Sequence, residues 1–196
     1  MSFDVSQGRD QGSDTVRAAL DTPSDLSREA TATLAESINR LVADAYVLYL
    51  KTKNFHWHVS GPNFRDFHEM LDEQSAQILE SIDPLAERAR KLGQPTLKSL
   101  SQILALTSLS ENDKDFVSPY DMLVELMNDN VAVARAMREA HGICDDWDDV
   151  ATASLIEQYL DETEKRTWFL FEAARAADAG GHSDAKLSRV YPAVCP

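Results

Sequence analysis

Four side chains that can bind a metal ion share one face of a predicted helix near the middle of the chain. They are His68, Asp72, Asp83 and Glu87. At roughly 100° per residue, they project at about 0°, 40°, 60° and 100° around the helix axis. Asp72 and Asp83 nevertheless lie about 16 Å apart along that axis, because each residue adds about 1.5 Å. One metal ion cannot bind both carboxylates, so the face carries two separate half-sites.

The two half-sites can complete each other across a twofold axis. If two such helices pack antiparallel, the His/Asp half of one chain faces the Asp/Glu half of its mate. His56 ends the preceding predicted helix, just before a turn at residues 61–62, and can fold back beside His68. A twofold interface is self-complementary, so two equivalent sites would form. A mixture of imidazole and carboxylate ligands suits Fe(II), Zn(II) or Mn(II).

Two familiar metal motifs fit this sequence poorly. A di-iron site inside a four-helix bundle uses Glu-x-x-His on two helices, and no histidine here has a glutamate three positions before it. Residues 68–72 (HEMLD) resemble a zinc-protease motif with Asp in place of the second His, but no third ligand follows at a suitable spacing. His58 is a poor partner for His56, because residues two apart point in nearly opposite directions on a helix.

Apolar residues that recur every three or four positions predict four long helices and one short helix. The expected ranges are about 27–59, 63–92, 97–106, 118–142 and 145–177. Ser118-Pro119 is a favourable helix start, Gly93 is a favourable helix end, and Pro84 predicts a local kink or a lost backbone bond. The predicted fold class is all-α, a four-helix bundle with a short extra helix in the long connection between helices two and three. That connection is long enough for helices two and three to run parallel.

The chain of 196 residues has room for one domain with tails. We expect a flexible acidic tail over 1–26, the bundle over 27–178 and a C-terminal tail over 179–196, because both ends have few large apolar residues. The net charge of −14 does not attract a phosphate backbone but can attract cations.

Composition also bears on location. No window holds the roughly 18 apolar residues of a membrane span, and the first residues lack the apolar core of a secretory signal. The two cysteines, Cys144 and Cys195, do not form a disulfide framework. We therefore expect a cytoplasmic protein without a membrane partner, and association with the nucleoid stays open.

The motif residues resemble the Dps family, the ferritin-like DNA-binding proteins from starved cells. The resemblance is carried by residues 56–72 (HWHVSGPNFRDFHEMLD), by Asp83-x-x-x-Glu87-Arg88, by Leu92-Gly93 and by residues 164–169 (EKRTWF). It spans about 27–177 and implies a ferritin-like bundle. It also implies a hollow shell of twelve chains with ferroxidase sites between twofold-related chains. The ligands would be His56, His68 and Asp72 from one chain and Asp83 and Glu87 from the other.

The resemblance implies oxidation of Fe(II) by hydrogen peroxide, storage of ferric mineral in the shell and protection of DNA from oxidative damage. Iron is then the metal, with zinc as a competitor for the same ligands. The acidic cluster at residues 145–149 would line a threefold iron pore or cap a helix. Two alternatives stay open, a structural protein that binds the nucleoid and a helical dimer that binds Zn(II) without redox chemistry.

The charge distribution predicts that duplex DNA binds weakly or not at all near neutral pH. Lys-rich tails commonly bind DNA in the resembled family, whereas residues 1–26 hold five Asp against two Arg and no Lys. A gel-shift assay at sub-micromolar protein and about 150 mM salt should show no complex. A complex that disappears when residues 1–26 are deleted would contradict this prediction.

Overall fold

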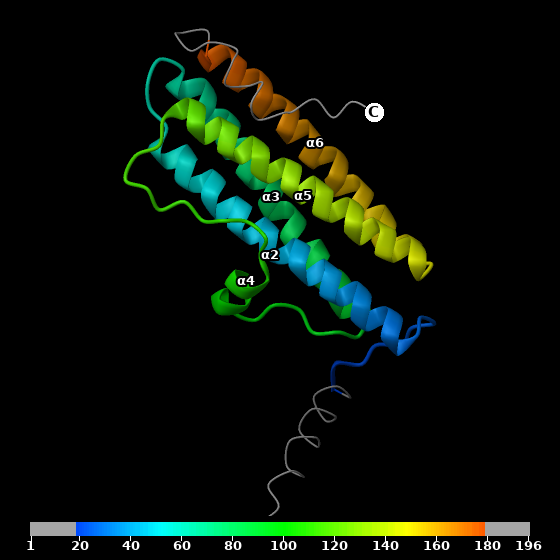
Figure 1. Ribbon diagram of the computed structural model, residues 1–196. Helices are drawn as coiled ribbons and strands as arrows, with labels where there is room; N and C mark the ends of the chain where they lie inside the picture. The colour runs from blue at the N-terminus through cyan, green and yellow to red at the C-terminus, as the bar shows by residue number, and fades with distance from the viewer. Residues whose placement is uncertain (1–18, 179–196) are drawn as a thin grey trace, which may run out of the picture.

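The computed structural model describes residues 19–178, and over this range the chain is helical without a β-strand. The helices are α2 (Arg28–His58), α3 (Phe64–Lys91), α4 (Leu100–Leu106), α5 (Pro119–Asp146) and α6 (Val150–Asp178) (Figure 1). The predicted all-α fold, with four long helices and one short helix in the long connection, is confirmed. None of the helices in this range is long and apolar enough to span a membrane.

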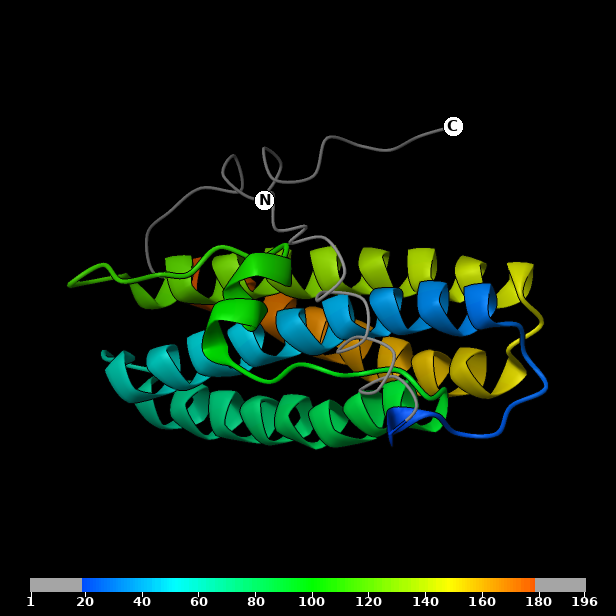
Figure 2. The same cartoon turned by 90° about the horizontal axis from the view of Figure 1, so that it is seen from below.

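The four long helices form two antiparallel hairpins, α2–α3 and α5–α6, packed side by side. In both views the connection after α3 runs back along the bundle before α5 begins (Figures 1 and 2). Helices α3 and α5 therefore run parallel, as predicted from the length of this connection. The short helix α4 lies in the connection and packs against α2.

Local sequence signals set several helix ends. The Ser118 hydroxyl oxygen accepts a hydrogen bond from the Asp121 N–H at 3.1 Å, with Pro in the first helical position of α5. Gly93 follows α3 with φ +75°, and the Gln94 N–H reaches back to the Ala89 carbonyl oxygen at 3.1 Å. This bond satisfies a carbonyl that the helix end leaves free. The predicted start of α5 and end of α3 therefore hold at these positions.

The predicted end of α5 near residues 141–142 is wrong by about one turn. The helix continues through Gly142 to Asp146. Glycine weakens a helix interior by only about 1 kcal/mol, and burial of Cys144 in the core favours the longer helix. Burial also raises the pKa of the Cys144 thiol to about 12, so this thiol is unreactive near neutral pH.

Large apolar side chains from all four long helices fill the bundle interior. The largest fully buried ones are Leu34, Ile38, Leu48 and Phe55 of α2, Leu71, Ile78 and Leu85 of α3, Leu123, Leu126 and Met127 of α5, and Ile156 and Leu170 of α6. Each contributes about 1.5–3 kcal/mol by leaving water. This core holds α2 and α3, which carry the predicted metal ligands, in a fixed relation.

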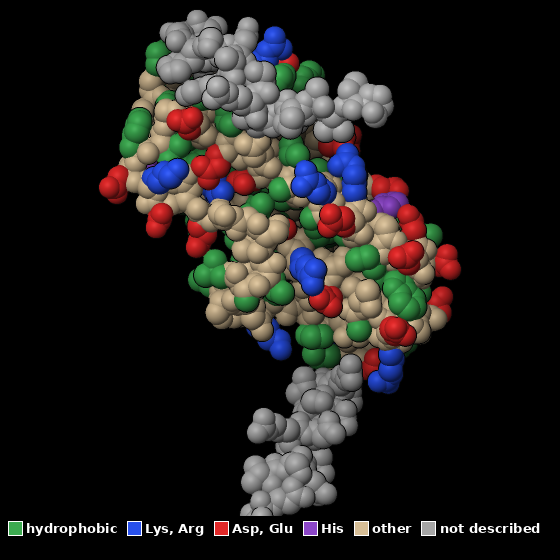
Figure 3. Space-filling view, in the orientation of Figure 1, with side chains coloured by type: hydrophobic (Ala, Val, Ile, Leu, Met, Phe, Trp, Pro, Cys, Tyr) green, Lys and Arg blue, Asp and Glu red, His purple; other side chains and the backbone are tan. Residues whose placement is uncertain are grey.

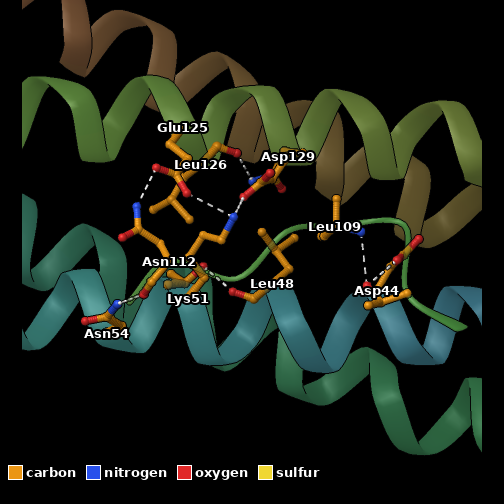
Figure 4. A network of polar contacts seen from close by, with 12 residues as sticks. Asp44, Leu48, Lys51, Asn54, Leu109, Asn112, Glu125, Leu126 and Asp129 are labelled. Atoms are coloured by element: carbon orange, nitrogen blue, oxygen red, sulfur yellow. Dashed lines mark hydrogen bonds and ion pairs between the residues drawn. The ribbon is translucent and has the colours of Figure 1, made fainter. Parts of the chain in front are cut away.

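A buried lysine joins the two hairpins (Figure 4). The ammonium of Lys51 in α2 lies 2.8 Å from a carboxylate oxygen of Asp129 and 3.0 Å from one of Glu125, both in α5. The side chain of Lys51 is only 3% exposed. Burial raises the pKa of Asp129, and the hydrogen bond from Lys51 opposes this rise. The pairing fixes α2 against α5, because a buried charge without a partner is costly.

Neighbouring polar contacts fasten the long connection to α2. The buried carboxylate of Asp44 accepts hydrogen bonds from the Ser108 N–H at 2.6 Å and from the Thr107 hydroxyl at 2.8 Å. One turn beyond Lys51, the Asn54 amide donates to the Asn112 carbonyl oxygen at 3.0 Å. The crossover is thus held to α2 at two places, near Asp44 and near Asn54 (Figure 4).

The predicted tails lie largely outside the described range, which omits 1–18 and 179–196. Residues just before α2 contact the end of α3. The Arg90 guanidinium donates to the Leu20 carbonyl oxygen at 3.0 Å, and the Thr22 hydroxyl donates to the Arg90 carbonyl oxygen at 3.2 Å. This last part of the predicted flexible tail therefore has defined contacts in the structure.

Replacing Lys51 with Met should lower the free energy of unfolding by about 3–5 kcal/mol, because Glu125 and Asp129 lose their buried cation. The loss should shrink as the pH falls. Without Lys51, the folded pKa of Asp129 rises further above its unfolded value, so the folded state binds the proton more tightly and gains stability below that pKa. Chemical denaturation between pH 5 and 8, at a fixed protein concentration, measures both effects.

The double variant with Lys51→Met and Asp129→Asn is the control for this explanation. It lacks the carboxyl group that titrates, so its stability loss should depend less on pH. An equal pH dependence in the single and double variants would contradict the assignment to Asp129.

Candidate metal centre

The imidazoles of His56 and His68 lie stacked where the end of α2 meets the beginning of α3. Their ring centroids are 3.8 Å apart. The Nδ1 atom of His56 lies 2.8 Å from the carbonyl oxygen of His68, and the Nδ1 atom of His68 lies 2.8 Å from the carbonyl oxygen of His56. A carbonyl oxygen only accepts hydrogen bonds, so both Nδ1 atoms carry the proton. This tautomer leaves the Nε2 atom of each ring as the one that can bind a metal ion.

The turn between the two helices brings these rings together. The Val59 N–H donates to the Phe55 carbonyl oxygen at 2.8 Å and closes α2, and Gly61 adopts φ +100°, which a residue with a Cβ rarely does. The Phe64 ring lies 5.0 Å from the His68 ring, nearly parallel to it. Reciprocal hydrogen bonds and ring stacking therefore hold both imidazoles in place without a metal.

Asp72 lies one turn after His68 on the same face of α3 and adds a carboxylate beside the imidazoles. Its Oδ1 atom is 3.9 Å from the Nε2 atom of His56. The same oxygen lies 2.5 Å from the ammonium of Lys53, whose hydrogen bond lowers the pKa of Asp72. The carboxylate is thus ionised near neutral pH. The structure brings His56, His68 and Asp72 together: His68 and Asp72 share one face of α3, and His56 lies beside His68 across the turn.

Sequence reasoning missed Lys53 at this site. It lies one turn before His56 on α2, so helical spacing places it on the same face. Its contact with Asp72, nineteen residues later, arises only when α2 and α3 pack together. This ammonium therefore competes with a divalent cation for the Asp72 oxygen nearest His56.

Asp83 and Glu87 lie far from these three residues within one chain. Both carboxylates are exposed on the last turns of α3, and Glu87 pairs with Lys91 at 3.4 Å. Asp83 follows Asp72 by eleven residues, about 16 Å along the helix. Between residues 19 and 178 no group of three His, Cys, Asp or Glu side chains is placed to hold a metal ion. The five predicted ligands therefore form two groups, and sharing them between chains stays a prediction.

The bundle interior contains a buried cation, whereas metal sites of four-helix bundles are built from side chains in the core. Arg166 is 5% exposed, and its guanidinium donates to the Asn130 amide oxygen at 3.0 Å and to the Thr163 hydroxyl at 2.7 Å. Burial lowers its pKa to about 10, so it remains charged near neutral pH. A positive charge among neutral partners disfavours a metal ion at this place, which agrees with the missing Glu-x-x-His motif.

The acidic side chains at residues 145–149, where α5 ends and α6 begins, differ in burial and in their contacts. Asp149 is buried and caps α6, where its carboxylate accepts a hydrogen bond from the Thr152 N–H at 3.1 Å. It also pairs with Arg88 at 2.7 Å. Asp145, Asp146 and Asp148 are exposed. The capping role is thus observed for Asp149, while an iron pore lined by the other three stays a prediction.

Comparison with known proteins agrees with this geometry. Residues 35–176 match the family model described as a ferritin-like domain. The DNA protection during starvation protein of Brevibacillus brevis is 35% identical over 137 residues, which cover 70% of this chain and 91% of that protein. The crystal structure of a Dps protein from Bacillus brevis matches with a TM-score of 0.72 and 33% identity, over 75% of this chain and 98% of that one.

A further solved structure connects the fold with iron chemistry in a relative. The Dps protein of Vibrio cholerae O1 matches with a TM-score of 0.71 and 26% identity, over 75% of this chain and 92% of that one. Its structure is described as a member of a broad superfamily of ferritin-like diiron-carboxylate proteins.

Replacing Lys53 with Met should tighten the binding of Co(II), used as an air-stable substitute for Fe(II), by about two- to fivefold, the range expected for loss of an exposed ion pair. The methionine keeps the aliphatic part of the side chain and removes the ammonium that competes for Asp72. Isothermal titration calorimetry on the metal-free assembled protein measures the change.

The matched control is Arg65→Met, which removes one positive charge from the same end of α3. Arg65 forms its ion pair with Glu69, at 2.8 Å, and not with Asp72. An equal gain in both variants would show that total charge, rather than release of Asp72, explains the effect.

Proposed function

Because the chain belongs to the Dps family of ferritin-like proteins, we propose that it oxidises Fe(II) with hydrogen peroxide and stores the ferric product in a hollow protein shell. This activity would protect DNA, since the peroxide and the Fe(II) that together generate hydroxyl radical are both consumed. The observation that carries the proposal is the His56–His68–Asp72 group, in which hydrogen bonds and stacking hold the two imidazoles beside the carboxylate and which is incomplete within one chain.

The proposed ligands suit iron as a substrate. Two neutral imidazole nitrogens bind Fe(II), and the carboxylate of Asp72 stabilises the additional charge of Fe(III). Two Fe(II) ions together give the two electrons that convert one hydrogen peroxide and two protons into two water molecules. Few protein ligands on each ion leave coordination positions for the oxidant and for departure of the product.

Asp83 and Glu87 of a second chain complete the proposed site. Both carboxylates are exposed on the same face of α3 as Asp72, and they lie at the opposite end of that face. An antiparallel twofold pairing of α3 helices would bring each carboxylate pair opposite a histidine pair and create two equivalent sites. We expect such dimers to assemble further into a shell of twelve chains.

The two alternatives have less support. Binding of Zn(II) without redox chemistry finds no support in the comparisons, and the relatives named above are Dps proteins. A role as a nucleoid-binding structural protein conflicts with the net charge of −14. Iron oxidation kinetics separate the proposed ferroxidase from both.

Mixing two inactive variants tests whether the site is shared. His68→Ala and Glu87→Ala should each lose most peroxide-driven Fe(II) oxidation, because each removes one ligand from every site. After chain exchange, a mixed dimer has one site with both ligands intact and one site with both missing. One of the two sites in each mixed dimer is therefore intact. The stopped-flow oxidation rate per mixed dimer should recover to at most about half that of the wild-type dimer.

A site formed within one chain predicts no recovery, because every chain would carry its own defect. Mass spectrometry must confirm that chains have exchanged in the mixed sample. Confirmed exchange without any gain in activity would exclude the shared site.

A further inference from the structure

The last two turns of α3 carry Glu87 and begin, directly after Asp83, with a weak point in the helix itself. Pro84 has no N–H, so the helix lacks the hydrogen bond that residue 84 would otherwise donate to the Glu80 carbonyl oxygen. This missing bond lies beside Asp83 and before Glu87. Contacts from outside the helix must therefore supply part of the rigidity of these two turns.

Arg88, the residue after Glu87, supplies such a contact to α6. Its Nε atom donates to the Thr152 hydroxyl oxygen at 2.7 Å, and its Nη2 atom donates to the Asp149 carboxylate at 2.7 Å. The side chains of Arg88 and Asp149 are 18% and 3% exposed. A planar guanidinium held by two partners fixes orientation as well as distance.

The partner of Arg88 is itself firmly placed. Asp149 caps α6 through the Thr152 N–H, and it follows Asp148, which adopts φ +55° at the corner between α5 and α6. Burial raises the pKa of Asp149, but hydrogen bonds from Thr152 and Arg88 outweigh burial and lower it. The carboxylate therefore stays ionised, and Arg88 is anchored to a rigid corner of the bundle.

The direction of Arg88 determines how the neighbouring carboxylate is presented. Consecutive residues point about 100° apart around a helix, so an arginine held against α6 leaves Glu87 pointing to the outer face. Side-chain ends lie about 5–6 Å from the helix axis, so a rotation of about 10° moves a carboxylate by about 1 Å. Metal sites need ligands placed within about 0.5 Å, so even a small rotation of these turns matters.

We propose that Arg88 and Asp149 are positioning residues that set the rotation of the last turns of α3 and thereby aim Asp83 and Glu87 at the shared metal site. This inference rests on the proposed function, in which these two carboxylates complete a site on the partner chain. It assigns part of the acidic corner at residues 145–149 to holding the half-site rather than to contact with the metal.

Co(II) binding to the assembled, metal-free protein tests the proposal without using activity. Titration followed by visible absorption gives both the dissociation constant and the ligand geometry around the ion. Glu87→Gln serves as the reference and should weaken binding and change the spectrum. Arg88→Gln and Asp149→Asn should each weaken Glu87-dependent binding by about 10- to 100-fold, the usual effect of losing a residue that orients a ligand.

The substitutions separate positioning from general damage. Asn keeps the capping ability of Asp149, so Asp149→Asn removes mainly the ion pair. Arg88→Lys keeps the charge but loses the contact to two partners at once, and its effect should lie between those of wild type and Arg88→Gln.

Arg90→Gln is the matched control, since Arg90 lies on the same helix and donates to backbone oxygens at its end. This control should bind Co(II) within about twofold of wild type, as expected for a residue that orients no ligand.

A double-mutant cycle gives the sharpest result. Because Arg88 would aim both Asp83 and Glu87, adding Arg88→Gln to Glu87→Gln should cause a smaller further loss than Arg88→Gln causes alone. Fully additive losses, or an equal loss in Arg90→Gln, would overturn the positioning role in favour of general loosening. If Arg88→Gln fails to assemble, Asp149→Asn decides the question by the same criteria.

The outcomes also distinguish this inference from the proposed function. Wild-type binding in Glu87→Gln would show that Glu87 is no ligand, and the proposed shared site would fail. Weak binding in Glu87→Gln together with wild-type binding in Arg88→Gln and Asp149→Asn would overturn the positioning role alone.

Discussion

The two hairpins of this bundle are held in a single register because a buried ammonium requires two carboxylates. Lys51 reaches Glu125 and Asp129 only when α2 and α5 are aligned as observed, and a shift by one turn would separate the buried ammonium from both carboxylates. Apolar packing alone is more tolerant, since many registers bury similar area. His56 follows Lys51 by five residues on the same helix, so the alignment that satisfies Lys51 also sets where α2 ends and where His56 lies against α3.

The sequence predicts the elements of the fold well because helix periodicity and end signals are local. The apolar spacing, Ser118 before Pro119 and Gly93 after α3 all act within a few residues, and each matches the structure. The end of α5 was mispredicted at Gly142 for the opposite reason. A glycine is a weak stop signal, and burial of Cys144 in the core outweighs it. Packing of this kind depends on residues distant in sequence, which spacing does not reveal.

The candidate site shows the same division between local and distant information. His68 and Asp72 are one turn apart, so their shared face follows from helix geometry alone. The partners that hold the site are different. Lys53 meets Asp72 across nineteen residues, and Arg88 meets Asp149 across sixty-one. Sequence analysis can therefore identify the ligand-type residues, whereas the contacts that orient them or compete for them need the folded structure.

The placement of charge in the bundle explains why metal chemistry would depend on assembly. Arg166 occupies the interior with neutral partners, so its positive charge opposes a metal ion inside a single bundle. The ligand-type side chains lie instead at the end of α2 and along α3, in two groups that are separated within one chain. Under the proposed function, Fe(II) is oxidised only where two chains meet. An unassembled chain would then leave Fe(II) unreacted, and oxidation would begin only with the pairing of chains from which the proposed shell is built.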